Sequence, residues 1–375
     1  MVDSLTRRLA SPLRTGWHAY RTKGWLKPFR NATPLLAGRA GQGMLSLIAI
    51  ALATRTLGAE VFGILVLITA LRQLVTGLTK LRARDTVLRF GAFALENGDH
   101  DRLRRLLRFG MGVDALSAVV AVSMIVLFAG MFAEAMNLPP AYRDLARLFG
   151  LSAMFAMLAN TADGVLRLFD RFDLVAGQNV LNPAIQVAGA LVLYGVGGGL
   201  ESFLAVWFLA LALSRIWTIA MGVRELRRRN IGPIGFPGWR DLRRPEAGVW
   251  HFTTGTYVVD ALGESKQHGA VLLIGAMLDP AAAAILRIAR QIGTMPTRPL
   301  SKVLTPALFP ELTRLTAAKA KRKRRKMATR SGLIAGGVAA VACLLLVVFG
   351  QSLISIIFGP GFDDAYWPMI IFAVN

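Results

Sequence analysis

The sequence predicts an all-α, polytopic membrane protein. Hydrophobic residues make up 54% of the 375 residues, above the share of about 45–50% that is typical of soluble domains. Several windows of about 20 residues are apolar enough to cross a hydrocarbon core of roughly 30 Å. The clearest are 111–132, 186–198 extended by 203–221, and 333–358. A third observation is that lysine and arginine are concentrated in every second connecting segment.

We divide the chain into apolar spans at 33–55, 61–79, 109–133, 144–166, 176–197, 202–222, 250–276, 281–302, 331–357 and 366 onward. If the N-terminus lies inside, the inside loops hold 33 lysine and arginine residues and the outside loops hold one, Arg143. This bias is a strong positive-inside signal. It predicts a cytoplasmic N-terminus, and it accounts for the net charge of +22 without nucleic-acid binding.

The basic segments at the membrane surface have their own predictions. We expect no cleavable signal peptide in residues 1–32, because the first long apolar run begins near Leu35. Their leucines and aromatics follow one helical stripe, which suits an interfacial helix, and a disordered basic tail is the alternative. "KAKRKRRKMATR" (319–330) is expected to lie against anionic inner-leaflet lipids. Cys343 is the single cysteine, so no internal disulfide can form.

The long loop 223–249 suggests a division into two halves. It follows six spans, and its glycines, prolines and arginines are typical of a cytoplasmic linker. Residues 33–222 then form a first six-helix bundle and residues 250–375 a second one with about four spans. The sequence stops at "WPMIIFAVN", inside an apolar run. Because a crossing helix needs about 20 residues, we expect the second bundle to be truncated and at least two spans to be missing.

Two outside turns share a pattern. In "TLGAEVFG" (56–63) and "IIFGPGFDDAYWP" (356–368), glycines flank an aromatic and an acidic residue before a new helix. Glycine supplies backbone angles that other residues avoid, and an acid favours a helix N-terminus. The predicted turn residues are Gly58, Glu60, Gly63 and Gly359.

At these residues the sequence resembles a known family. "ATRTLGAEVFGILVLITAL", "LTPALFPELTRL" (304–315) and "IFGPGFDDAYWPM" are similar to motifs of the polysaccharide biosynthesis proteins, the Wzx-type oligosaccharide-lipid flippases. These proteins belong to the multidrug/oligosaccharidyl-lipid/polysaccharide exporter superfamily. The resemblance covers the chain from about Asn31 to its end. It implies two six-helix bundles around a central cavity that opens alternately to each side.

The resemblance also implies a substrate, undecaprenyl-diphosphate carrying a sugar repeat unit. The protein would then be a multi-pass protein of the bacterial cytoplasmic (inner) membrane. It would flip this lipid for exopolysaccharide, O-antigen or capsule synthesis. The protein partner that such a role implies is a polysaccharide polymerase machinery.

Ionisable residues inside the spans make a separate argument. "YVVDALGESKQHGAVLLIGAML" (257–278) contains Asp260, Glu264, Lys266 and His268. Each charge at a bilayer centre costs roughly 2.5–3.5 kcal/mol on insertion scales. Helical spacing puts the two acids and the histidine on one face, with Lys266 turned toward another helix or outward.

Other spans carry arginines and amides. Arg72 lies roughly 16 Å from one end of its span and roughly 10 Å from the other at a rise of 1.5 Å per residue, so we expect it to face a cavity. Arg167 and Arg215 lie nearer the cytoplasmic side, and we expect them to reach toward headgroups. The alternative for all these charges is that they pair with each other and lock helices together. The candidates for the cavity wall are Arg39, Arg72, Arg287, Arg290, Lys266, Asn160 and Gln186.

Arginines suit a lipid diphosphate because guanidinium groups replace its hydration with bidentate, charge-assisted bonds. A sugar needs a polar wall, for which the sequence offers Gln42, Gln178, Asn179, Asn182 and Gln186. The acids that are candidates for ion coupling are Asp260, Glu264 and Asp163. Proton uptake by an acid would couple flipping to the proton gradient. The competing interpretation is that Asp260 and Glu264 pair with Lys266, Arg287 or Arg290.

Other functions are less well supported. A membrane glycosyltransferase or polymerase needs acids or a base at an aqueous face, yet the outside loops are short. HExxH, G-x-S-x-G and Cys/His metal spacings do not occur, so we expect no catalytic residues, metal or cofactor. A small-molecule exporter for cationic drugs would need an acid-dominated pocket, whereas arginines favour an anionic substrate. A lipid II flippase stays open as an alternative, because lipid II carries the same diphosphate.

Overall fold

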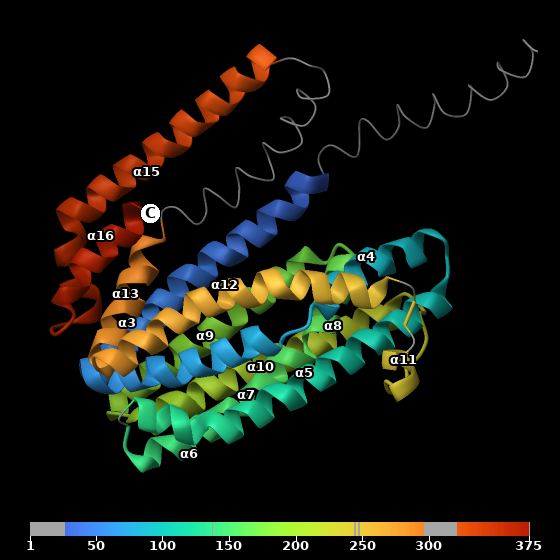
Figure 1. The fold of residues 1–375 in the computed structure, drawn as a ribbon. Coiled ribbons are helices and arrows are strands. Elements are labelled where there is room, and N and C mark those ends of the chain that lie inside the picture. The colour runs from blue at the N-terminus through green and yellow to red at the C-terminus, as the bar shows by residue number, and fades with distance from the viewer. Residues whose placement is uncertain (1–26, 137, 244, 247, 296–320, 375) are drawn as a thin grey trace, which may run out of the picture.

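The computed structural model describes residues 27–295, apart from 137, 244 and 247, and residues 321–374. Every regular element in these ranges is helical, as the sequence predicts (Figure 1). The helices before the 223–249 loop are α3 (Lys27–Thr79), α4 (Ala83–Glu96), α5 (His100–Ala135), α6 (Pro140–Gly150), α7 (Ser152–Leu158), α8 (Asn160–Leu168), α9 (Phe172–Val196) and α10 (Leu200–Arg228). The later ones are α11 (Trp239–Arg243), α12 (Val249–Met277), α13 (Pro280–Gly293), α15 (Lys321–Phe358), the 3-10 helix η1 (Asp363–Ala365) and α16 (Tyr366–Val374).

Six helical segments of the described chain are long and apolar enough to cross a membrane. They are Gly38–Thr79, His100–Ala135, Pro140–Leu168, Phe172–Val196, Leu200–Arg228 and Ala340–Phe358. Large apolar side chains on α5 stay exposed, including Leu127 and Met131. In lipid this exposure is favourable, because acyl chains are as apolar as leucine. The prediction of a polytopic helical membrane protein is therefore confirmed.

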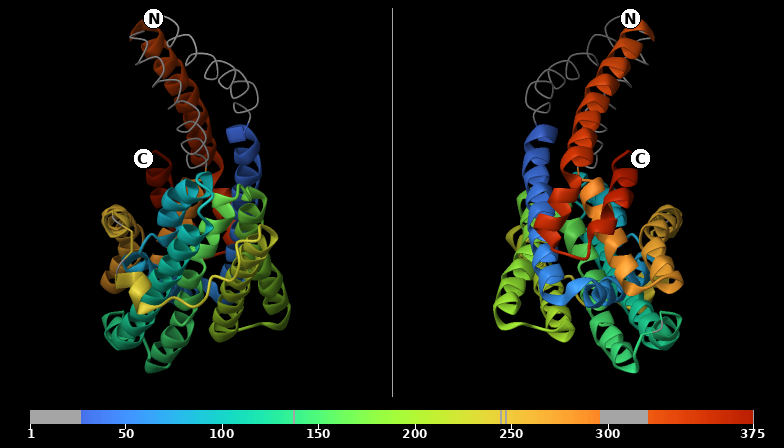
Figure 2. Two further views of the ribbon diagram at one scale, coloured as in Figure 1. Left: turned by 90° about the vertical axis from the view of Figure 1, so that its right-hand side faces the viewer. Right: turned by 90° about the vertical axis from the view of Figure 1, so that its left-hand side faces the viewer.

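The first helix, α3, bends sharply at Gly58. Its backbone angles there are φ 73° and ψ 176°, a conformation that glycine adopts at little cost. The chain reverses at this point, so α3 supplies two antiparallel segments (Figures 1 and 2). Glu60 follows the bend and is exposed, and Gly359 turns the chain after α15 with φ 87°.

Gly63 does not form part of the turn, although we had predicted that it would. It lies in the helix after the bend and is not among the glycines with positive φ. A Cβ atom at this position would lie 1.9 Å from the carbonyl oxygen of Pro280. Gly63 therefore allows α13 to pack directly against α3.

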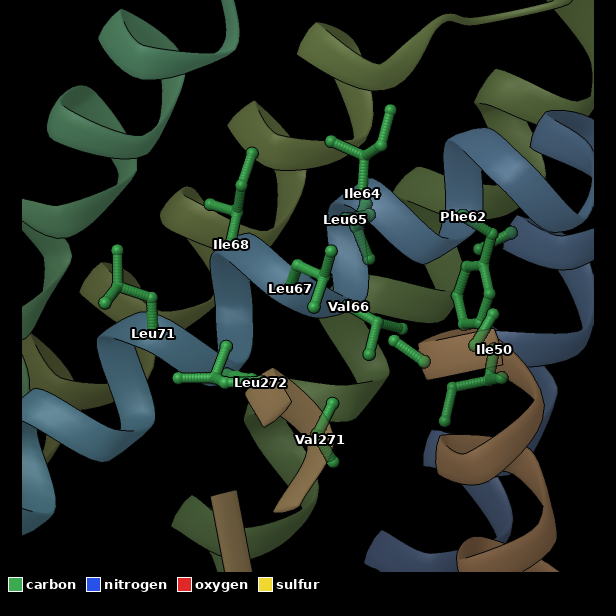
Figure 3. Packing of buried hydrophobic residues seen from close by; sticks show 14 of the residues in the cluster. Ile50, Phe62, Ile64, Leu65, Val66, Leu67, Ile68, Leu71, Val271 and Leu272 are labelled. Carbon is green, nitrogen blue, oxygen red and sulfur yellow. The ribbon is translucent and has the colours of Figure 1, made fainter. Parts of the chain in front are cut away.

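The main hydrophobic core joins the second segment of α3 to helices beyond the 223–249 loop. Phe62, Leu67 and Ile68 are almost completely buried and belong to the same cluster as Val271 and Leu272 of α12 (Figure 3). Helices α12 and α13 pack along α3, and α16 packs on α13. The second part of the chain is thus anchored to the first through α3, while its assignment as a separate bundle stays a prediction.

Two elements depart from the predicted spans. The predicted span 144–166 is interrupted near Leu151 and Ala159, which separate α6, α7 and α8. The predicted loop 80–108 contains an amphipathic helix, α4, which packs on α5 and α8. The motif 304–315 lies outside the described residues, as do residues 1–26. Helix α15 extends away from the other helices, and its contacts are with α3, η1 and α16 (Figure 2).

Candidate substrate cavity

Two adjoining cavities lie beside α3, α10 and α13, one of them reaching α12 and the other α9. The larger, which we call the basic cavity, has a volume of about 470 Å³. The smaller, which we call the amide cavity, has a volume of about 310 Å³. Both are lined by Arg72, Gln73, Leu211, Arg215 and Arg287. The two cavities therefore share one wall, which carries three guanidinium groups.

The wall of the basic cavity is strongly cationic. It contains Arg72, Lys80, Arg82, Arg84, Arg215 and Arg287. Among the described residues of this wall, the single carboxylate belongs to Glu264. The Glu264 carboxylate lies 3.1 Å from His268 Nε2, one helical turn along α12. Gly77 makes room for this acid, because a Cβ at Gly77 would lie 2.5 Å from Glu264 Cβ.

Two of these cations are neutralised at the start of α4. Asp85 pairs with Arg82 at 2.5 Å and with Arg84 at 3.0 Å. Burial alone would raise the pKa of Asp85, but hydrogen bonds from Arg84 and Arg82 hold it below the ordinary value of 3.8. Asp163 lies 3.6 Å from Arg84 and 2.9 Å from Arg167. This network joins the start of α4 to α8 beside the cavity.

Arg72, Lys80 and Arg215 have no such neutralising partner. Within the described part of the chain, no carboxylate lies at salt-bridge distance from any of the three. The Nε atoms of Arg72 and Arg215 are buried without a hydrogen-bond partner there. Uncompensated charges in a protein interior are costly. Their presence beside a void therefore favours an anionic occupant.

Arg72 is held in place by an aromatic ring. Its guanidinium carbon lies 5.7 Å from the centroid of the Phe149 ring, within the distance of a cation–π interaction. Phe149 lines the amide cavity, so the ring orients Arg72 at the junction of the two cavities. This contact leaves the edge of the guanidinium available for hydrogen bonding.

The amide cavity has a different chemistry. Its wall contains Gln42, Gln178, Asn179, Asn182 and Gln186. Four of these belong to α9, where positions 178, 182 and 186 repeat every four residues and so share one face. Asn182 donates to Ser214 Oγ at 3.4 Å, whereas Gln178 Oε1 is buried without a hydrogen-bond partner in the described chain. Amides with free bonding capacity suit the hydroxyl groups of a sugar.

The structure separates the predicted wall residues into two groups. Those that line a cavity are Arg72, Arg287, Asn160 and Gln186. Arg39 is exposed and lines neither cavity, although Gln42 and Ser46 on the same helix line the amide cavity. Lys266 is likewise exposed and lines neither cavity. Arg290 lines neither cavity and donates to the backbone oxygen of Gln267 at 2.5 Å, which ties α13 to α12 behind the wall of the basic cavity.

The candidates for ion coupling are also distributed differently from our expectation. Glu264 lines the basic cavity and pairs with His268, where we had considered pairing with lysine or arginine. Asp163 is held between Arg84 and Arg167 and lines neither cavity. The side chain of Asp260 lies outside the described part of the structure.

Four cationic wall residues are missing from the sequence-based prediction, namely Lys80, Arg82, Arg84 and Arg215. We expected Arg215 to reach the headgroups, but it lines both cavities, so that expectation was wrong. Lys80 was counted among the loop charges. Arg72 and Thr76 of α3 and Lys80, which directly follows α3, are spaced four residues apart, and this spacing is the signal that predicts one shared face.

The helical fold and its internal cationic cavity define a class, a multi-pass membrane protein with a polar chamber between its helices. The chain belongs to the polysaccharide biosynthesis protein family, which it matches over residues 29–316. It is 26% identical over 339 residues to the inner membrane protein YghQ of Escherichia coli (strain K12). This alignment covers 90% of the present chain and 94% of YghQ.

The fold is that of solved MATE transporters. An inward-facing MATE family multidrug resistance transporter of the MOP superfamily has a TM-score of 0.60 and 14% identity, with 90% of this chain and 75% of that chain covered. The Vibrio cholerae MATE transporter VcmN in its bent form has a TM-score of 0.58 and 13% identity, with 93% and 86% covered. The predicted fold class is therefore confirmed.

Proposed function

We propose that the protein is a flippase for an undecaprenyl-diphosphate-linked oligosaccharide in the bacterial inner membrane. The observation that carries the proposal is a set of three cations in the wall of the basic cavity, Arg72, Lys80 and Arg215, which no described carboxylate neutralises. The family membership supports a transport role in polysaccharide biosynthesis. The related E. coli protein is described as an inner membrane protein, which supports the location.

In this proposal the two cavities hold different parts of one substrate. The diphosphate binds the basic cavity, where guanidinium groups replace its water with charge-assisted hydrogen bonds. The sugar unit occupies the amide cavity, whose side chains exchange hydrogen bonds with hydroxyls. Arg72 and Arg215 line both cavities, at the place where phosphate and sugar would join. Alternating access then carries this loaded site from the cytoplasmic to the outer side.

Two alternatives share the fold. A lipid II flippase would use the same cationic wall, because its substrate carries the same diphosphate. A small-molecule exporter for cations is disfavoured by the charge of the cavity, since six lysine or arginine residues face one glutamate among the described wall residues. The same proposal includes a cytoplasmic N-terminus and a polysaccharide polymerase as protein partner. It also includes exopolysaccharide, O-antigen or capsule as the polymer that the transported lipid supplies.

The test is lipid binding to the purified full chain and its Arg72→Gln/Arg215→Gln variant. Hydrogen bonds to charged groups contribute about 1.5–3 kcal/mol each, so the variant should bind undecaprenyl diphosphate at least about tenfold more weakly. Arg39→Gln is the matched control, because Arg39 is an exposed arginine of the same helix outside both cavities. It should bind like the wild type.

Folding and substrate class are measured in parallel. Removing uncompensated buried charge is neutral or stabilising, so the double variant should keep its melting temperature. Competition between lipid II and an undecaprenyl-diphosphate oligosaccharide then separates the two flippase functions. Unchanged diphosphate binding by the double variant would exclude the proposed site, and tighter binding of lipid II would favour the alternative substrate.

A further inference from the structure

A second basic site lies at the end of α5, away from the two central cavities. Residues of α5 and of the 223–249 loop enclose a groove of about 930 Å³. We call it the linker groove. Its walls are formed by Arg102, Arg105, Leu106, Phe109, Trp239, Arg240, Asp241, Arg243, Pro245 and Glu246. Sequence patterns identify this loop only as a linker and do not predict the groove.

The loop is docked onto α5 by specific contacts (Figure 1). Leu242 packs against Gly112 of α5, where an added Cβ would lie 3.0 Å from the Leu242 side chain. The backbone oxygen of Leu242 accepts a hydrogen bond from Nε1 of Trp250, a residue of α12, at 2.8 Å. Asp241 lies 3.3 Å from Arg108. The linker is therefore a positioned part of the protein surface, and its side chains can form a defined binding site.

The groove has a surplus of positive charge. Arg102 is neutralised, because its Nε and one Nη donate to the two carboxylate oxygens of Glu246. The carboxylate of Asp241 forms an ion pair with Arg108, which does not line the groove. No carboxylate of the described residues lies at salt-bridge distance from Arg105, Arg240 or Arg243. Three guanidinium groups therefore converge on the groove without a counter-ion from the described chain.

Exposed aromatic side chains occur in the same region, where Trp239 lines the groove and Phe236 precedes Trp239 by three residues in the loop. Trp239 is 72% exposed and Phe236 is 96% exposed. Phe93 of α4 is 54% exposed and lies under the guanidinium of Arg102 at 4.8 Å. Exposed tryptophan and phenylalanine are unfavourable in water, whereas amphipathic aromatics are enriched at the level of lipid headgroups.

The position of the groove along α5 agrees with the level of the lipid headgroups. The apolar part of α5 begins at Phe109. At a rise of 1.5 Å per residue, Arg105 and Arg102 lie about 6 and 10 Å beyond it. This distance corresponds to the polar layer next to the hydrocarbon core, where phosphate groups are found.

We propose that the linker groove binds the phosphate of an anionic phospholipid headgroup, with Trp239 and Phe236 inserted beside the lipid. Arg105 contributes from α5, and Arg240 and Arg243 contribute from α11. A bound headgroup thereby joins the first bundle to the loop that leads into α12. The occupant is a lipid of the surrounding bilayer and differs from the transported substrate, so the inference is independent of the proposed function.

The first test counts lipids that stay bound to the purified full chain in native mass spectrometry. Phosphatidylglycerol should bind in preference to phosphatidylcholine. Each basic residue near an anionic membrane contributes about fivefold in affinity, so Arg240→Gln/Arg243→Gln should reduce phosphatidylglycerol binding by about tenfold or more. Arg227→Gln/Arg228→Gln is the charge-matched control, because these exposed arginines end α10 outside the groove.

The second test places Trp239 relative to the bilayer. Lipids brominated in their acyl chains quench tryptophans that lie at the membrane interface. Wild type and Trp239→Phe are compared in vesicles of phosphatidylcholine with and without phosphatidylglycerol. The difference in fluorescence between the two proteins is the contribution of Trp239. This contribution should decrease when the lipid is brominated.

Three outcomes would overturn the inference. One is that the groove variant and the control variant lose the same amount of phosphatidylglycerol binding relative to the wild type. Another is an unquenched Trp239, which would place the groove in water. The third is displacement of bound lipid by inorganic phosphate alone, which would make free phosphate the ligand. Matching circular dichroism spectra of all variants ensure that the comparison is made between folded proteins.

Discussion

Gly63→Ala tests the packing that joins the two parts of the chain. The added Cβ would lie 1.9 Å from Pro280 O and 2.3 Å from Pro280 C. Carbon–oxygen contacts are normally about 3.3 Å or longer, so α3 and α13 would have to separate by roughly 1.4 Å. The neighbouring Leu67 and Ile288 are completely buried and would lose contacts. Overpacking of this kind costs about 1–3 kcal/mol.

The matched control for this prediction is Gly43→Ala. Gly43 lies on the same helix, and a Cβ there would meet no atom within 4 Å. Alanine favours a helix over glycine by about 1 kcal/mol, so this variant should be as stable as the wild type or more stable. The assay is thermal unfolding in detergent, followed by far-ultraviolet circular dichroism. If Gly63→Ala melts at or above the temperature of Gly43→Ala, the close α3–α13 contact does not exist.

The remaining predictions concern two carboxylates of the first half. Asp114→Ala should destabilise the fold by about 1–3 kcal/mol, because Asp114 is buried and accepts a 2.8 Å hydrogen bond from the backbone nitrogen of Thr161. For Asp85, hydrogen bonds from Arg84 and Arg82 hold the pKa below 3.8 against the effect of burial. Its stabilising contribution is therefore present above the unfolded-state pKa of about 3.9 and is lost as the pH falls below that value. Denaturation in detergent as a function of pH should show a weaker acid dependence in Asp85→Asn than in the wild type.

Each of these substitutions has its own comparison. Asp114→Asn keeps an oxygen acceptor for Thr161, so it should be more stable than Asp114→Ala; equal stability would show that the hydrogen bond contributes nothing. Asp101→Asn removes an exposed i,i+3 partner of Arg104, and such pairs contribute at most about 1 kcal/mol. An identical pH profile for Asp85→Asn and Asp101→Asn would argue against the depressed pKa of Asp85.

The local features of the fold follow from the amino-acid sequence alone. Span positions follow from apolar runs of about 20 residues, since crossing the hydrocarbon core depends on length and hydropathy. The bend at Gly58 follows from the backbone freedom of glycine. The depth of Arg72 in its span predicts a cavity residue, and Arg72 lines both cavities. The fold class and the family are therefore determined by the sequence itself.

The composition of the cavity wall required the tertiary structure. Arg39, Arg215 and Arg290 all lie in predicted spans, yet only Arg215 lines a cavity. A helical period assigns residues to faces of one helix, but it does not say which neighbouring helix covers each face. That choice depends on contacts between distant segments, such as Gly63 against Pro280 and Gly77 against Glu264. Sequence thus determined which charges enter the membrane region, and packing decided which of them meet a void.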